Sequence, residues 1–155
     1  MIANLLLTSG ELHELPGVLY CDKMVTTPHP RLSIVIPVYN EQEGIAVFHN
    51  QLSEVVQKVA HESYEIIYSD DGSSDNTATL IRDMAKSDHH IKLLCLSRNF
   101  GKEIALSAAI HMATGDAVIM LDGDGQHPVA MLPQFVEAWQ AHPESRSARR
   151  TVNVA

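Results

Sequence analysis

The amino-acid sequence predicts an α/β protein whose mostly parallel sheet is covered by helices. Short apolar, β-branched runs alternate with segments of helical periodicity, and this alternation occurs four times. In addition, every unusual polar loop follows a predicted strand. Because the carboxyl ends of parallel strands meet at one rim of a sheet, these loops are expected to lie together and to bind a ligand there.

The first strand–helix unit begins at Leu32. The run 32–38 is short, apolar and bounded by prolines, which is typical of a buried strand. Pro37 has no N–H group and is expected to release the end of this strand from its ladder. Apolar residues then recur at spacings of three and four, which predicts an amphipathic helix. They are Ile45, Phe48, Leu52, Val55, Val56 and Val59.

Three further units repeat the order of strand and helix. They comprise a strand at 64–69, a helix ending near 87, a strand at 91–96, a helix at 103–114, a strand at 117–121 and a helix from 128 to 140. Side chains of the turn 71–75 can cap the second helix. Gly115 is expected to stop the third helix, and Pro128 suits the first turn of the fourth.

The two ends of the chain differ from this pattern. Residues 1–27 show no clear period and are interpreted as an N-terminal extension, either an ordinary arm or a consequence of a start assigned upstream of Met24. Residues 28–140 form the predicted domain. Residues 141–155 have no amphipathic period and supply no further strand with helix, so the sheet is expected to be incomplete. We interpret this tail as a truncation or a shifted reading frame.

Composition narrows the class of protein. A net charge of −8 argues against a nucleic-acid partner, and no run reaches the roughly 18 apolar residues that span a bilayer. The run 5–7 is too short for a signal sequence. Cys21 and Cys95 lie far apart and are interpreted as reduced thiols. The sequence as written therefore predicts a soluble, cytoplasmic chain, in which His89 and His90 are expected to lie in a solvated loop.

The first two polar loops can bind a nucleoside. In the loop 37–41, an aromatic ring lies beside polar groups, which suits base stacking, although a structural loop is the alternative. In the loop 70–75, a carboxylate at the end of a strand can accept N–H bonds from uracil or guanine. The alternative there is a turn whose aspartates and serines serve only as caps.

The third and fourth loops can bind phosphate and metal. Arg98 and Lys102 flank a glycine just before a helix, where phosphate is favoured, although they can equally be solvated surface cations. Asp122 and Asp124 follow an apolar strand, and Gln126 continues their alternate spacing. Three oxygen ligands of this kind suit Mg²⁺ or Mn²⁺, and the alternative is a turn without metal.

Other motif families fit this fourth loop less well. A calcium-binding EF-hand beginning at Asp122 requires glycine and glutamate where this chain has His127 and Pro133, so that motif is excluded. Phosphatases that phosphorylate an aspartate generally have Thr or Val at the position of Gln126 and carry the motif on their first strand. No G-x-G-x-x-G follows the first strand, so a dinucleotide site is unsupported.

Together, four ordered motifs resemble family 2 glycosyltransferases. Within that family the sequence is most similar to polyprenyl-phosphate sugar transferases, such as dolichol-phosphate mannose synthases and bactoprenol glucosyltransferases. The resemblance extends from about Leu32 to Gln140. The motifs are Ser33–Glu41, Asp70–Thr77, Arg98–Lys102 and Leu121–Pro128.

The resemblance implies a Rossmann-like GT-A fold that binds a UDP- or GDP-linked sugar. It implies that Asp71 contacts the base and that Arg98 and Lys102 belong to the donor site. It also implies three nucleoside-pocket residues and three ligands of a Mg²⁺ or Mn²⁺ ion on the donor diphosphate. These are Pro37, Tyr39 and Glu41 for the pocket, and Asp122, Asp124 and Gln126 for the metal.

The implied reaction is a single inverting displacement onto a polyprenyl phosphate, at the cytoplasmic face of a membrane in full-length relatives. Because a lipid phosphate is already ionised near pH 7, the sequence identifies no catalytic base. The family continues with an arginine-bearing acceptor loop, and Arg146, Arg149 and Arg150 do not form a recognisable version of it. The alternative function is therefore a remnant that binds nucleotide and metal without transferring sugar.

Overall fold

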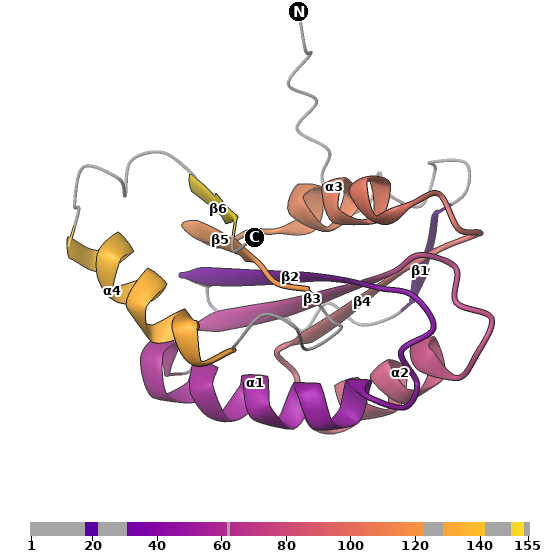
Figure 1. Ribbon diagram of the computed structural model, residues 1–155, viewed down its shortest axis with the longest axis horizontal. Coiled ribbons are helices and arrows are strands. Elements are labelled where there is room, and N and C mark those ends of the chain that lie inside the picture. Colours follow the sequence, from indigo (N-terminus) through magenta and orange to yellow (C-terminus); the bar gives the residue numbers. More distant parts are fainter. Residues whose placement is uncertain (1–17, 22–30, 62, 123–128, 142–149, 154–155) are drawn as a thin grey trace, which may run out of the picture.

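A computed structural model describes residues 18–21, 31–61, 63–122, 129–141 and 150–153. The described chain forms one six-stranded sheet in the order β1-β4-β3-β2-β5-β6 (Figure 1). The strands are β1 (Val18–Cys21), β2 (Leu32–Val38), β3 (Tyr64–Asp70), β4 (Ile91–Leu96), β5 (Ala117–Met120) and β6 (Arg150–Asn153). The helices are α1 (Ile45–Ala60), α2 (Thr77–Ser87), α3 (Lys102–Met112), the 3₁₀ turn η2 (Val129–Met131) and α4 (Leu132–Ala141).

Helices cover both faces of the sheet. In Figure 1, α1, α2 and α4 lie on one face and α3 lies on the other. Successive side chains of a strand point to opposite faces, so β2 contributes Ile34 and Ile36 to the larger core and Val35 to the smaller core beneath α3. The predicted fold class, a mostly parallel sheet covered by helices, is confirmed. Within the described ranges no helix is long and apolar enough for a bilayer crossing.

The strand order creates a reversal between β2 and β5. The chain moves outward from β2 through β3 to β4, all in parallel, and then returns past β2 to place β5 on its other side. In open α/β sheets, ligands bind outside the carboxyl ends of the strands at such a reversal. A ligand site is therefore expected beyond the carboxyl ends of β2 and β5.

Pro37 contributes to this expected site. The N–H and C=O of one residue in a parallel strand face the same neighbour, and Leu121 N–H donates to Val35 C=O on the β5 side. Pro37 is two residues further along β2, so the N–H group that it lacks would face β5 as well. The pairing of β2 with β5 accordingly ends before Pro37, at Val35 and Met120. Pairing with β3 continues through Val38. The expected release is thus confirmed toward β5 and wrong toward β3.

Two helix boundaries differ from the prediction. The third helix, α3, ends at Met112 and not near Gly115. A Cβ atom at Gly115 would lie 2.7 Å from the backbone nitrogen of Ser33, so this glycine permits close packing of two segments. The fourth helix begins at Leu132, after a 3₁₀ turn. Pro133 therefore occupies its first turn, and Pro128 lies outside the described residues.

Both ends of the sheet carry a strand that the sequence did not reveal. β1, within the predicted N-terminal extension, pairs antiparallel with β4, and β6 pairs parallel with β5. Residues 141–155, which were expected to supply no further strand with helix, therefore contribute the strand β6. Each of these strands has four residues, which is too short for a recognisable alternating pattern, and the open edges of β4 and β5 provide the hydrogen-bonding partners.

Candidate functional site

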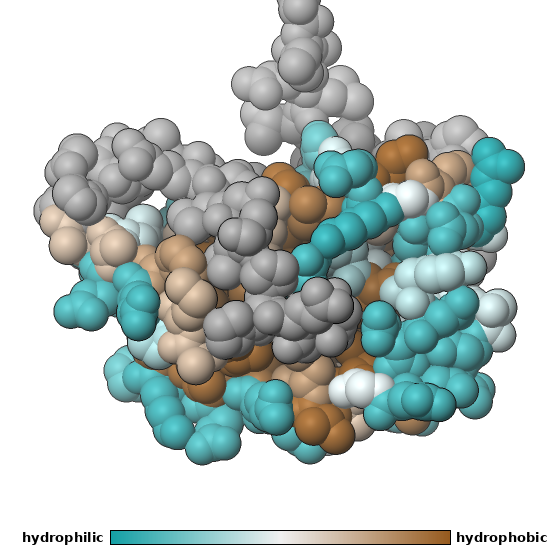
Figure 2. Space-filling model, viewed as in Figure 1, coloured by the Kyte–Doolittle hydropathy of each residue, from teal (hydrophilic) through white to brown (hydrophobic). Residues whose placement is uncertain are grey.

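A cavity of about 260 Å³ lies at the reversal point between β2 and β5. It brings together residues from four loops, which follow β2, β3, β4 and β5. Figure 2 shows that hydrophilic residues prevail on the right-hand side of the molecule. Val38, Asn99 and Gly101 line it without having been singled out from the sequence. The predicted site residues that line it are Pro37, Tyr39, Glu41, Asp71, Lys102 and Asp122.

The loop after β2 is held by the loop after β3. Asn40 adopts a left-handed conformation with φ of 54°, and its N–H donates to Ser73 Oγ at 2.9 Å. In return, Ser74 N–H donates to Asn40 Oδ1 at 2.9 Å. Glu41 N–H donates to Thr77 Oγ1 at 2.8 Å. These reciprocal bonds fix the backbone beneath the pocket.

The Tyr39 side chain remains accessible on this fixed backbone. It is 45% exposed, although large aromatic side chains are usually well buried. Tyr39 lines the same cavity as Pro37 and Glu41. An exposed ring at the mouth of a cavity is available to stack on a planar ligand.

Asp71 joins the second loop to the third. Its carboxylate is 3% exposed and accepts the backbone N–H groups of Phe100 and Gly101 at 2.7 and 2.9 Å. Next to it, Gly72 has φ of 70°, and a Cβ atom there would lie 2.4 Å from the carbonyl carbon of Arg98. The close approach of the two loops therefore requires glycine at 72 and an acceptor at 71.

The neighbouring carboxylates of Asp70 and Asp75 accept hydrogen bonds from within the loops and so stabilise them. Burial raises the pKa of Asp70, although hydrogen bonds from Ser73 oppose that shift. Burial also acts on Asp75, but hydrogen bonds from Thr77 and from the Gln42 N–H hold the pKa of Asp75 below its ordinary value. Asp75 thus accepts the N–H of Thr77, the first residue of α2, but the N-cap residue is Asn76 and makes no side-chain cap hydrogen bond, so the predicted side-chain cap is not found at the N-cap itself.

The two predicted cations occupy different positions. Lys102 lines the cavity, and its Nζ lies 2.5 Å from Asp122 Oδ1 at the end of β5. The Arg98 guanidinium lies 4.7 Å from the centre of the Phe100 ring, is exposed, and does not line the cavity. The structure thus joins Lys102 and Asp122 but leaves Arg98 outside the cavity.

The described part of the predicted metal site fits a hard divalent cation. Asp122 provides a carboxylate at the cavity wall, 23% exposed, and Mg²⁺ and Mn²⁺ prefer oxygen ligands of this type. The other two predicted ligands, Asp124 and Gln126, lie outside the described residues. The assignment of this metal site therefore remains a prediction that rests here on Asp122.

The fold and the cavity define an α/β domain that binds a ligand at a strand-order reversal. The chain belongs to glycosyl transferase family 2, whose model matches residues 33–151. It is 40% identical over 121 residues to a prophage bactoprenol glucosyl transferase homolog of Escherichia coli K12. That alignment covers 78% of this chain and 39% of the relative.

Solved structures agree with the predicted GT-A fold. The mannosyltransferase PcManGT of Pyrobaculum calidifontis, in complex with GDP-Man and Mn²⁺, has a TM-score of 0.64 and 29% identity over 76% of this chain and 34% of its own. S. aureus TarS 1-349 has a TM-score of 0.62 at 23% identity, over 72% of this chain and 33% of its own. The chain thus spans about two fifths of its curated relatives.

Proposed function

We propose that this chain forms the donor-binding part of an enzyme that transfers sugar from a nucleotide-diphosphate sugar to a polyprenyl phosphate. The observation that carries the proposal is the cavity at the reversal point, where the exposed Tyr39 ring lies within reach of the same ligand as the Lys102–Asp122 pair. An aromatic surface and a paired cation and carboxylate match the two parts of such a donor, its base and its diphosphate. Family membership supports this interpretation.

The cavity residues divide into two groups. Pro37, Tyr39 and Glu41 surround the nucleoside, with the Tyr39 ring as the stacking surface. Asp71 accepts two N–H groups of the third loop, and we propose, as the family resemblance implies, that it also contacts the base. Lys102 lies on the phosphate side, and Arg98 reaches the diphosphate only after leaving the Phe100 ring. The proposed cation ligands are Asp122, Asp124 and Gln126.

The proposed reaction is one inverting displacement at the anomeric carbon. Asp122, Asp124 and Gln126 would hold the Mg²⁺ or Mn²⁺ ion, which would supply Lewis-acid stabilisation of the charge on the diphosphate. Lys102 adds positive charge at the same place, where its ammonium group pairs with Asp122. A polyprenyl phosphate is ionised near neutral pH, so the acceptor attacks without a general base from the protein.

The acceptor class rests on the relatives. Several are named bactoprenol glucosyl transferases, including those of Shigella phages SfX and SfV. We therefore propose a polyprenyl phosphate acceptor and action at the cytoplasmic face of a membrane. The donor nucleotide is proposed as UDP or GDP, and the PcManGT complex with GDP-Man is the support for the guanosine form.

Calorimetric titration with UDP and with GDP tests the donor site. Binding of one nucleotide is expected to require Mn²⁺ and to disappear with a chelator. Asp122→Asn is expected to weaken it by about 10- to 150-fold, the equivalent of ~1.5–3 kcal/mol for a lost charge-assisted contact. Asp124→Ala is expected to act in the same direction. Asp83→Asn is the matched control, because Asp83 pairs with Lys86 on exposed α2.

A transfer assay separates the enzyme from the binding-only alternative. The chain is incubated with Mn²⁺, a radiolabelled UDP- or GDP-sugar and polyprenyl phosphate in detergent, and lipid-linked sugar is counted. Transfer that Asp122→Asn abolishes supports the enzyme. Metal-dependent nucleotide binding without transfer supports the binding-only alternative, and the absence of both rejects the proposed site.

A further inference from the structure

A second group of metal-ligating side chains lies away from the donor cavity. It is formed by Asp88, His89 and His90, at the end of α2 and the entry to β4, together with His49 of α1. A depression of about 520 Å³ between α1 and this segment is lined by all four residues. None of them lines the donor cavity. We call this set the Asp88 cluster.

The two adjacent histidines do not share one environment. His89 is exposed, as predicted for a solvated loop, but His90 is only 6% exposed, so that prediction is wrong for His90. The His90 ring stacks on Tyr64, with ring centres 4.1 Å apart and an interplanar angle of 9°. The buried Tyr64 ring thus holds His90 in one orientation beside the exposed His89.

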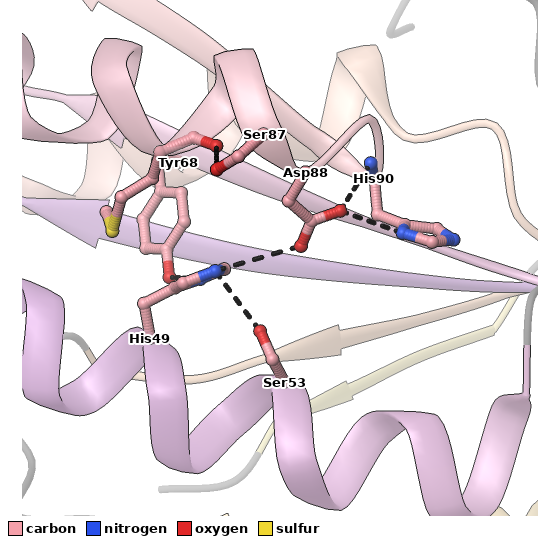
Figure 3. Close-up of polar contacts among 7 residues, drawn as sticks. His49, Ser53, Tyr68, Ser87, Asp88 and His90 are labelled. Carbon is pink, nitrogen blue, oxygen red and sulfur yellow. Dashed lines mark hydrogen bonds and ion pairs between the residues drawn. The ribbon is translucent and has the colours of Figure 1, made fainter.

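Asp88 is the centre of the cluster (Figure 3). Its Oδ1 accepts the backbone N–H of His90 at 2.9 Å and lies 2.8 Å from His90 Nδ1. Its Oδ2 lies 3.7 Å from His49 Nε2. The carboxylate therefore has one histidine on each side, from two different elements of the fold.

The ligand atoms of the Asp88 cluster lie near enough to one another to hold one ion. Asp88, His89 and His90 each offer a ligand atom within 4.8 Å of the others. Around a tetrahedral ion with bonds of about 2.0–2.2 Å, neighbouring ligand atoms lie roughly 3.3–3.6 Å apart. The gap between Asp88 Oδ2 and His49 Nε2 is close to that spacing, and it is too long for a hydrogen bond.

His49 is also oriented by its neighbours. Tyr68, which is fully buried, has its hydroxyl 3.1 Å from His49 Nδ1, so Nε2 is the ring atom that faces Asp88. Metal-binding histidines typically have their second nitrogen held by such a partner. Ser53 Oγ lies 3.2 Å from the same Nε2 and provides a further oxygen at this place.

We propose that the Asp88 cluster is a binding site for a divalent transition-metal ion of the zinc class, separate from the donor-site cation. Asp88, His89 and His90 supply three ligands, and His49 supplies the fourth from α1. The ion takes the place of the proton between Asp88 and His90. Imidazole ligands favour Zn²⁺, Co²⁺ or Ni²⁺ over Mg²⁺, so the two sites differ in metal class. A metal ion bound at the Asp88 cluster would link α1 to the segment that precedes β4.

The test is titration of the full chain with Co²⁺ alone, without nucleotide, followed by visible absorption, and with Zn²⁺ followed by calorimetry. One Co²⁺ is expected to give the intense spectrum of a tetrahedral site. His89→Ala is the main variant, because the side chain is exposed and its loss should not affect folding. It is expected to lower the affinity for the metal by at least about tenfold. Loss of a residue that only orients a metal ligand already costs about 10- to 100-fold, and loss of a ligand itself should cost no less. His49→Gln is expected to act likewise.

Two controls identify the site. His111→Ala removes another exposed histidine, on α3, and is expected to leave binding unchanged. Asp122→Asn removes a donor-site carboxylate and is also expected to have no effect, so failure of this proposal and failure of the proposed function remain distinguishable. Equal binding by the native chain, His89→Ala and His49→Gln would overturn the proposal. An equal loss in His111→Ala would likewise assign the binding to scattered surface histidines.

Discussion

Asp71 shows how one side chain determines the shape of the donor cavity. Both of its carboxylate oxygens accept backbone N–H groups of the loop that follows β4. From the sequence, the same residue was predicted to contact the base of the nucleotide. The contact with the base remains a prediction. The two hydrogen bonds to the loop are contacts within the protein itself.

Replacing Asp71 by Asn is expected to disturb the loop as well as the ligand. An amide has only one acceptor oxygen, and its NH₂ group would face a backbone N–H that needs an acceptor. We expect UDP or GDP affinity to fall by about 10- to 150-fold, or ~1.5–3 kcal/mol. Titration with inorganic diphosphate separates the causes. A similar loss for diphosphate supports the loop role, and an unchanged diphosphate affinity would assign the whole effect to the base.

Gly72→Ala tests the close approach of two loops. Its φ of 70° is unfavourable for alanine, and the added Cβ would lie 2.4 Å from backbone of Arg98. We expect the free energy of unfolding to fall by at least about 2 kcal/mol. Gly44→Ala is the matched control, because φ is −104° and no atom lies within 4 Å of the added Cβ. Urea denaturation measures both, and equal effects would contradict this account.

At the scale of elements, a buried polar network fastens three strands together. Glu65 of β3 is 1% exposed and accepts Ser33 Oγ of β2 at 2.5 Å and Thr114 N–H at 2.7 Å. Lys92 of β4 reaches its other oxygen at 2.5 Å. Gly115 N–H donates to Ser33 Oγ at 2.8 Å and closes the network. The network lies on the α3 face and fixes the register of β2, β3 and β4.

Removal of the lysine from this network is expected to be costly. Lys92→Met leaves a buried carboxylate without its cation, and breaking a buried pair in this way typically costs about 3–5 kcal/mol. We expect the lower end of that range, because the Lys92 side chain is 15% exposed. Lys86→Met breaks an exposed pair with Asp83 and is expected to cost less than about 1 kcal/mol. Comparable urea midpoints for the two variants would refute the role of the network.

The same network predicts an acid dependence of stability. Burial alone would raise the pKa of Glu65, but Lys92, Ser33 and Thr114 together hold it below its ordinary value. The unfolded state therefore takes up the proton first. Stability from Glu65 is fully present above the unfolded pKa of about 4.3 and is lost as pH falls through the lower folded pKa. Denaturation between neutral and acid pH should show a shallower decline for Glu65→Gln than for the native chain. Parallel curves would contradict this prediction.

At the scale of the whole molecule, the donor cavity and the sheet edges are separate. Among the described residues, those that line the cavity lie between positions 37 and 122, whereas β1 pairs with β4 at the edge of the sheet. The larger core is built from the central strands and the helices α1, α2 and α4. The described edge strands β1 and β6 therefore extend the sheet without lining the cavity.

A chain that begins at Met24 tests this separation. It lacks β1 and leaves an edge of β4 unpaired, so its unfolding midpoint in urea is expected to be lower than that of the full chain. Its nucleotide affinity is expected to stay within about twofold, since distant sites couple by only ~0.3–0.5 kcal/mol. A loss of affinity well beyond this, in a chain that still folds, would show that the edge supports the cavity.

The sequence by itself determined the four strand–helix units and most of the described residues that line the cavity. Local periodicity identified β2, β3, β4 and β5 almost to the residue. Because the ends of parallel strands share one rim, the sequence pattern also predicts that Tyr39, Asp71, Lys102 and Asp122 lie together, as they do at the cavity.

Tertiary structure alone decided which segments meet. The return of β5 to the side of β2 opens the cavity, and nothing in either strand's own pattern specifies that neighbour. The contacts of Asp71 with Phe100, and of His49 with Asp88, join residues 29 or more positions apart. Local patterns report only which residues are buried and with what period. Partners across such distances are selected by the packing of the whole sheet and its helices.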